Sequence, residues 1–277
     1  MPHSLATLSL NYSAENGKTV LRHVHSGPLR VLKSLYPEGS RICHNILIHP
    51  PSGLVGGDVL DIQIALDEGA HALITTPGAA RFFASKAHSA LQKTRATLKN
   101  HARLEWLPME TLAYSGCLGS NETCFELGQE SMLLAWDIVS LGLPHAKMPF
   151  LEGRFSQHLE IKDVLLEKGT VNAEDHRLLK SPVGLNGKSC LATMVLACGT
   201  PFPKALRDKV VDMAREICDA QSHAIKIGVS APSEKAVVVR SLSDQVEPCM
   251  KVFQMIRSAW RSEVWKTSTD SPRIWQT

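Results

Sequence analysis

Hydrophobic and polar residues alternate along most of the chain. In the stretch DVLDIQIAL (58–66), Leu60, Ile62 and Ile64 fall on one side of an extended backbone and Asp61 falls on the other. Short stretches of the same kind, separated by turn sequences such as PEGS, DEGA and LNGK, occupy 29–37, 43–49, 71–77, 91–99, 103–108, 123–127, 133–142, 154–161, 164–171 and 190–199. This spacing predicts a mainly β fold of stacked or wrapped sheets rather than alternating strands and helices.

Two later stretches, 202–221 and 247–265, have a helical period instead. Their apolar positions at helical spacing are Leu206, Val210, Val211, Ala214 and Ile217, and then Met250, Phe253, Ile256 and Trp260. Each stretch has a proline near its start, where the missing N–H costs little. The stretch between them, 223–243, reads as two strands joined around APSEK.

Residues 203–265 are therefore predicted to form a helix–strand–strand–helix part that packs on a β-rich body at about 11–200. No linker rich in proline or serine separates the two parts. We expect residues 1–277 to form a single domain, with about two helices in its C-terminal α/β part.

Composition narrows the class of protein. Hydrophobic residues make up 44% and charged residues 21% of the 277 positions, as in soluble globular proteins. A net charge of +3 and an aromatic content of 5% give no argument for nucleic acid or membrane as a partner. Seven cysteines at irregular spacings, with no CxxC pair and no secretory segment, predict reduced thiols in a cytoplasmic protein.

The most unusual stretch is HPPSGLVGGD (49–58). It is neither a Walker loop nor a dinucleotide fingerprint, because no Gly-Lys-Ser/Thr follows and the next element reads as a strand. Two prolines fix φ, and three glycines permit backbone angles closed to other residues, so the stretch predicts a preformed turn with Asp58 at its exit. Such turns are more often architectural than functional, and both interpretations remain open here.

Candidate chemistry is sparse elsewhere. His23 and His25 in HVH would face one way on a strand, and His44 and His49 lie near Cys43, but neither group has a recognised tight metal-binding pattern. No GxSxG elbow is present. Carboxylates in apolar surroundings are the more interesting feature; they are Asp58, Glu105, Glu110, Asp137 and Glu167. Each would cost free energy if buried and unpaired, although some of them could face solvent.

Several of these stretches together resemble the UreD (UreH) family of urease accessory proteins. The resemblance is carried by GPLRVLKSLYPEG, CHNILIHPPSGLVGGD, GAHALITTPGAARFF, LEWLPMETL, LLAWDIVSLGLP and PRIWQT, in the family's order from about Asn11 to the last residue. It implies a two-layer, helical arrangement of β-strands with a small helical part. It also implies a non-enzymatic chaperone that binds apo-urease and recruits UreF and, through UreF, the GTPase UreG.

The resemblance further implies an internal tunnel for nickel in transit, with no tightly bound cofactor. Asp58, Glu110, Asp137 and Glu167 match acidic positions of the family and are the candidates for a transient nickel path. Two departures put the set of ligands in doubt: Val59 stands where the family often has a second carboxylate, and Ala80 aligns with a tunnel hydroxyl. A few scattered oxygen ligands suit an ion that must move on, whereas a dense Cys/His site would trap it.

Two alternatives stand beside this hypothesis. One is a metal-dependent hydrolase that uses Asp58 and Glu110; the other treats the glycine turns and carboxylates as purely structural. The closing DSPRIWQT is also open to two interpretations. The more common one is a terminal strand that packs on its own body through Trp275, and the other is a surface for UreF.

Overall fold

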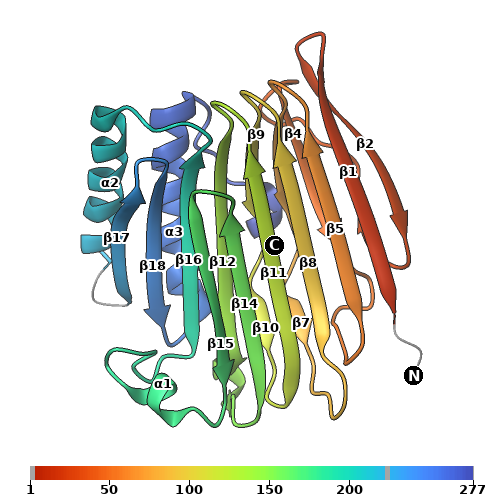
Figure 1. The fold of residues 1–277 in the computed structure, drawn as a ribbon, viewed down its shortest axis with the longest axis vertical. Coiled ribbons are helices and arrows are strands. Elements are labelled where there is room, and N and C mark those ends of the chain that lie inside the picture. The colour runs from red at the N-terminus through yellow and green to blue at the C-terminus, as the bar shows by residue number, and fades with distance from the viewer. Residues whose placement is uncertain (1–3, 222–224, 277) are drawn as a thin grey trace.

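Two stacked β-sheets form the body of the protein, and two long helices cover the outer face of one of them (Figure 1). The computed structural model describes residues 4–221 and 225–276. In the first sheet the order is β15 (Leu165–Asn172), β14 (Gly153–Ile161), β11 (Cys117–Leu127), β8 (Ala90–Leu98), β5 (Val59–Leu66), β1 (Leu5–Glu15) and β2 (Lys18–Ser26).

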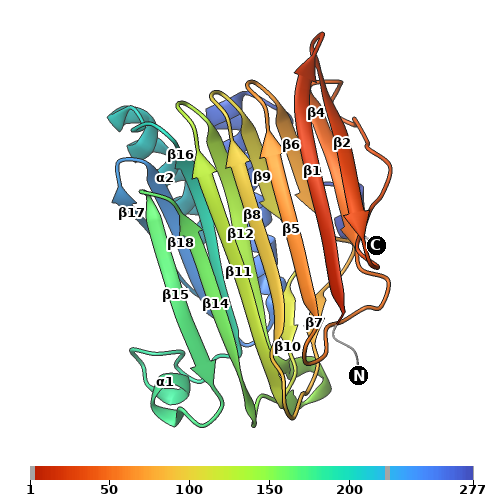
Figure 2. The same ribbon diagram turned by 45° about the vertical axis from the view of Figure 1, so that its right-hand side comes forward.

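The second sheet is broader. Its order is β17 (Lys226–Ser233), β18 (Ala236–Ser243), β16 (Cys190–Cys198), β12 (Met132–Leu143), β9 (Arg103–Leu107), β6 (His71–Thr75), β4 (Ile42–Ile48) and β3 (Arg30–Val31). Three short strands attach at the side, β7 (Ala80–Phe82), β10 (Thr111–Ala113) and β13 (Met148–Pro149). Figure 2 shows β7 and β10 at one end of the two layers.

The chain alternates between the two sheets from β4 to β14. Strands β4, β6, β9 and β12 enter the second sheet, and β5, β8, β11 and β14 enter the first in between, each parallel to its predecessor in the same sheet. One register row of the first sheet runs through Ile62, Thr94, Thr123 and Leu159. This helical course of strands in two layers confirms the predicted fold class.

The period-two pattern has the predicted consequence for burial. Leu60, Ile62 and Ile64 are buried between the sheets while Gln63 is exposed. The inward residues of both sheets form one continuous apolar core. The polar residues described below lie within these strands, between residues of this core.

The two predicted helices cover the outer face of the second sheet. They are α2 (Lys204–Asp219) and α3 (Val246–Trp260), and α3 continues as a π-helical turn, η2 (Arg261–Trp265). A second apolar core lies between them and the sheet, containing Trp136, Phe253 and Trp260. The Trp260 indole donates a hydrogen bond to the Val210 carbonyl at 2.8 Å, which fixes the two helices together.

A buried cluster of charges ties the end of α3 to the sheet. Arg257 Nε and Arg261 Nε each lie 3.1 Å from a different oxygen of Glu105, and all three side chains are fully buried. His71 Nε2 is 3.2 Å from the same carboxylate, and Arg261 also pairs with Glu38 at 2.9 Å. Glu105, one of the carboxylates in apolar surroundings, therefore has a structural partner set on the outer face of the second sheet.

The N-terminal strands were missed by the sequence prediction. β1 and β2 form a hairpin around Asn16 and Gly17, which have φ of 49° and 78°. The β-rich body thus starts at Leu5 rather than at about residue 11. The predicted strand at 29–37 is mostly wrong: only Arg30–Val31 is a strand, with an isolated bridge at Leu35.

The remaining helical segments of the described residues are short. They are α1 (His176–Lys180) and the 3₁₀ turns η1 (Pro144–Ala146) and η3 (Arg273–Gln276). The predicted strand pair around APSEK is present as β17 and β18; positions 223 and 224 at the start of its predicted range lie outside the described residues. Within the described ranges, no helix is both long and apolar enough to cross a membrane.

The C-terminal segment packs on its own body, as a 3₁₀ turn rather than the predicted strand. Trp275 contacts Trp136 with ring centroids 5.2 Å apart, and its indole N–H donates to Thr75 Oγ1 at 2.8 Å. The Arg257 guanidinium lies 5.3 Å from the centre of the same ring. This tail closes one side of the buried charge cluster.

Candidate functional site

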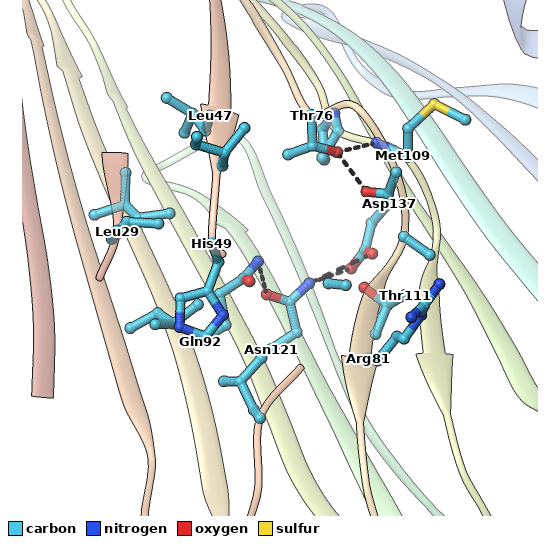
Figure 3. A pocket seen from close by; sticks show the side chains of 18 of the residues that line it. Leu29, Leu47, His49, Thr76, Arg81, Gln92, Met109, Thr111, Asn121 and Asp137 are labelled. Atoms are coloured by element: carbon cyan, nitrogen blue, oxygen red, sulfur yellow. Dashed lines mark hydrogen bonds between the residues drawn. The ribbon is translucent and has the colours of Figure 1, made fainter. Parts of the chain in front are cut away.

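A cavity of about 370 Å³ lies between the two sheets (Figure 3). One wall follows the ends of β4, β6 and β9, where His49, Thr76 and Pro108 come directly after the strands. The opposite wall consists of inward side chains of the first sheet, including Gln92 and Asn121. Asp137 of β12 lines it as well.

A second cavity of about 620 Å³ lies further along the same interior. Strands β14 and β15 of the first sheet and β16, β17 and β18 of the second provide most of its lining, which includes Glu167, Thr193 and Arg240. Asp137 and Leu159 line both cavities. Asp137 therefore stands where the two spaces adjoin.

Two rows of polar residues face each other across this interior. In the first sheet Gln92, Asn121 and Gln157 are register partners on β8, β11 and β14. In the second sheet Asp137, Thr193 and Arg240 are register partners on β12, β16 and β18. We call these six residues together the polar row. Because register partners on neighbouring strands point to the same face of a sheet, in the parallel first sheet and in the antiparallel part of the second alike, one polar residue per strand is enough to build it.

Hydrogen bonds connect the polar row from sheet to sheet. Gln92 Nε2 donates to Asn121 Oδ1 at 3.4 Å, and Asn121 Nδ2 donates to the Asp137 carboxylate at 3.3 Å, as the dashed lines in Figure 3 show. Gln157 Nε2 reaches the same carboxylate at 3.1 Å. Asp137 thus accepts amide N–H groups from two strands of the opposite sheet.

Burial between the sheets raises the pKa of Asp137, while the Gln157 and Asn121 amides act in the opposite direction. The negative charge of Glu167 also raises it. An oxygen ligand held in this way is costly to ionise without a nearby cation, and a positive ion close to it would relieve that cost.

Glu167 occupies the far end of the row. It extends from β15 in the first sheet and accepts a hydrogen bond from Thr193 Oγ1 of the second sheet at 3.1 Å. Arg240 forms an ion pair with the same carboxylate. Glu167 therefore bridges the two sheets at the lining of the second cavity, and one of its oxygens is already engaged by a guanidinium.

Asp58 stands at the exit of the glycine-rich turn, as predicted, and it does not line either cavity among the described residues. Its Oδ2 accepts the Val55 N–H at 2.9 Å and so closes the turn. Gly53 and Gly56 are required by close packing, because a Cβ would lie 2.2 Å from the Phe83 ring and 2.0 Å from Ser85 Oγ. The rigid turn is thus seated against the segment that contains β7.

His49, at the start of this turn, connects it to the first cavity. Burial lowers the pKa of His49, and the negative charge of Asp58 acts against that shift. The two side chains therefore interact electrostatically, although Asp58 itself lies outside the lining of the cavity.

Glu110 also lies outside the lining of both cavities, although its neighbours Met109 and Thr111 line the first one. Burial raises the pKa of Glu110, and the charge of Glu247 from the start of α3 acts in the same direction. Alternation along the chain directs Glu110 away from the interior that Thr111 faces. Of the four acidic candidates, the structure brings Asp137 and Glu167 together and leaves Asp58 and Glu110 apart from them.

Both positions that depart from the family's pattern are close to this region. Ala80 lines the first cavity at the start of β7, where Thr76 and Thr111 provide hydroxyl groups. Val59 is the first residue of β5. Over residues 4–221 and 225–276, no three or more His, Cys, Asp or Glu side chains are grouped so that they could hold a metal ion.

The amides of the polar row were missed by the sequence analysis. The signal was present: Asn121 interrupts the inward set Cys117, Gly119, Thr123 and Phe125, and Gln157 stands between the buried Phe155 and Leu159. Neither amide carries a charge, and only the pairing of the strands shows that they meet Asp137.

Known proteins match this chain over nearly its whole length. The model of the family described as "UreD urease accessory protein" matches residues 4–276. The urease accessory protein UreD of Albidiferax ferrireducens is 51% identical over 270 residues, which are 98% of this chain and 98% of that protein. Proteins of the same name from a Polaromonas species and from Variovorax paradoxus are each 47% identical over 98% of this chain, and over 98% and 99% of their own lengths. On this full-length agreement, the chain belongs to the UreD urease accessory protein family.

Proposed function

We propose that this chain is a scaffold for urease maturation. In this proposal it binds the urease apoprotein, recruits UreF and, through UreF, the GTPase UreG, and passes nickel through its interior toward the urease active site. Family membership supports the role in maturation, and the accessory proteins of this family are non-catalytic scaffolds, so the hydrolase alternative is not retained.

The observation that carries the nickel path is the position of Asp137. It lines both interior cavities, and hydrogen bonds link it to polar residues on either side. A divalent cation that moves between the two spaces must pass this carboxylate. Burial raises the pKa of Asp137, and the hydrogen bonds to its carboxylate come from neutral amides, so a nickel ion close to it would offset the cost of ionisation.

The chemistry of the row fits passage better than storage. Its ligands are amide, hydroxyl and carboxylate oxygens, which bind nickel more weakly than thiolate or imidazole clusters do. Glu167 is the next carboxylate after Asp137, and a passing ion would have to displace Arg240 from it. In this proposal nickel is cargo, and no tightly bound cofactor takes part.

The partners remain part of the proposal, and the late helices are poor candidates for their surface. Val210, Phe253 and Trp260 are buried against the second sheet, so the apolar faces of α2 and α3 are already covered. Large apolar side chains are exposed elsewhere, for example Leu151 at 70% and Met148 at 55%.

The seven cysteines are free thiols, which favours the reducing cytoplasm as the place of this function.

The test is Asp137→Asn, which keeps the size of the side chain and its hydrogen-bond acceptor and removes the charge. In cells that express urease and its accessory proteins at limiting nickel, we expect urease activity to fall by about tenfold or more, since Asp137 is the carboxylate that lines both cavities. Nickel content of the purified urease is the second measurement. A matched control is Asp212→Asn, an exposed carboxylate on α2.

Two further measurements distinguish the loss of the nickel path from damage to the fold. The variant should still co-purify with UreF and urease. Because the folded state raises the pKa of Asp137, its ionised form costs stability at neutral pH, and Asp137→Asn should be as stable as the original chain or more so. Full urease activation by a stable Asp137→Asn variant would refute the path and leave the scaffold role standing.

A further inference from the structure

Two histidines on strand β2 stand apart from the interior. His23 and His25 are both exposed, and their rings are stacked with centroids 6.4 Å apart and an angle of 18° between their planes. We propose that this pair forms a surface site for a transition-metal cation of the nickel and copper type. The site is separate from the interior path and does not depend on it.

The strand register places both rings on one face. His23 is paired with Leu10 and His25 with Leu8, and these leucines point into the core between the sheets. Val24 between them points to the opposite face and is 73% exposed. Because β2 is the edge strand of the first sheet, the two imidazoles project at its open border, where a hydrated ion can approach them.

The absence of a carboxylate partner distinguishes this pair from other histidines of the chain. Those with a carboxylate oxygen within 3.3 Å are His44, His71, His101, His145 and His158. Among the described residues, neither the His23 nor the His25 side chain has a hydrogen bond or an ion pair, and the ring contact of each is with the other. Their ring nitrogens are thus available as ligands.

The two rings can form a bidentate site once their side chains rotate toward each other. A metal bound at about 2.1 Å from each imidazole nitrogen needs the two nitrogens within about 4.2 Å of each other. Exposed side chains reach this by rotation about their χ angles, which costs little in open solvent. Since the chain groups no third ligand of the usual kinds there within its described ranges, water would complete the coordination. Binding would be weak and exchangeable.

Ligand type also sets the choice of metal. Imidazole favours copper, nickel and zinc, and for a given nitrogen site affinity rises from cobalt to nickel to copper. The polar row in the interior offers mainly oxygen ligands, so the two sites differ in chemistry. A hard cation such as Mg²⁺ should not bind at the histidine pair.

The experiment is a calorimetric titration of the full chain, without an affinity tag, with Ni²⁺ alone. We expect one equivalent to be lost, or weakened by about tenfold or more, in His23→Ala, in His25→Ala and in the double variant alike, because a chelate needs both rings. Val24→Ala, on the opposite face, and His101→Ala, an exposed histidine paired with Glu130, are the controls and should leave the titration unchanged.

The outcomes are distinct. If the two single variants each remove half of the effect of the double variant, the histidines bind independently and the chelate is refuted. An unchanged titration in the double variant refutes the site altogether. Asp137→Asn should still bind the equivalent of Ni²⁺ at the histidine pair. Refutation of the interior path would therefore leave this test of the surface site valid. The variants lie on an exposed strand face, and circular dichroism checks that they fold.

Discussion

Glu105 shows how a single buried charge is held in this fold. Its carboxylate is fully buried, with Arg257 and Arg261 each 3.1 Å away. Glu105→Gln would leave the buried Arg257 guanidinium without an opposite charge and Arg261 with Glu38 alone, and breaking a buried pair from one side costs about 3–5 kcal/mol. We expect the free energy of unfolding in urea to fall by that amount. Glu130→Gln, at an exposed ion pair, should change it by less than about 1 kcal/mol.

If Glu105→Gln lowers the free energy of unfolding as little as Glu130→Gln does, Arg257 and Arg261 find other partners. The carbonyls of Asp270 and Ser268, which already accept hydrogen bonds from these arginines, are the candidates. Replacing Glu105 by leucine gives a second measurement, because it removes the charge without offering a new acceptor.

The same cluster predicts how stability depends on pH. Burial acts to raise the pKa of Glu105, but Arg257, His71 and Arg261 lower it to about 2, against an ordinary value of 4.5. The unfolded chain therefore takes up this proton first on acidification. The contribution of Glu105 is complete above pH 4.5 and is lost as the pH falls toward 2.

His71 acts at higher pH and in the same direction. Burial lowers the pKa of His71 from its ordinary 6.5, and so its neutral form is favoured in the folded protein. Stability should begin to fall below pH 6.5 and fall further below pH 4.5 in urea unfolding at a series of pH values. The lower stage should shrink in Glu105→Gln. Because the raised pKa values of Asp137 and Glu110 act in the opposite direction in both proteins, the profiles of the original chain and the variant are compared, and identical profiles would contradict this assignment.

At the level of residues, the sequence predicted part of the candidate site. Asp137 and Glu167 were recognised because carboxylates are unusual in apolar strands, and they lie in the same interior. Asp58 and Glu110 satisfy the same sequence rule and lie outside both cavities. The rule gives the residue type, whereas the face to which a side chain points depends on the register of the strand that carries it.

At the level of elements, the period and the length of the hydrophobic pattern decided which helices and strands could be predicted. The helices α2 and α3 have long apolar stripes, strands β5 and β14 alternate, and β12 is a nearly continuous apolar run, so their ranges were close to those observed. The hairpin of β1 and β2 was missed although Asn16-Gly17 is a turn signal. The stretch 29–37 contains enough apolar residues for a strand, but it pairs with β4 only at Arg30–Val31 and at a bridge.

The C-terminal tail is the element whose role can be tested most directly. Trp275 stacks near Trp136, bonds to Thr75 and lies beside Arg257. Trp275→Ala should lower the free energy of unfolding by about 2–3 kcal/mol, less than for a fully buried tryptophan because part of the ring is exposed. Gln276→Ala is the control and should have no effect.

Truncation after Asp270 extends the test to partner binding. If the tail supports the surface for UreF, its removal should abolish co-purification with UreF. Binding that survives the truncation, together with a loss of stability, would confine the tail to holding α3 and the charge cluster on the sheet.

For the whole molecule, the shared second sheet supports the prediction of a single domain. Strand β16 pairs directly with β12 of the alternating body, and β18 pairs in turn with β16. The two apolar cores lie on opposite faces of this one sheet, and the Glu105 cluster joins α3 to β9 through it. If the second sheet unfolds, both apolar cores become exposed to solvent.

A cooperative transition is the expected consequence. Trp106 reports on the core between the sheets, and Trp260 and Trp265 report on the core under the helices. In urea, the fluorescence of a variant that retains Trp106 alone or Trp260 alone should change at the same midpoint as the circular dichroism of that same variant. If the helical side unfolds at a lower urea concentration while Trp106 stays buried, the chain consists of two units. The interior path would then be framed by the alternating strands alone, because β16 and β18, which carry Thr193 and Arg240, would separate from Asp137 first.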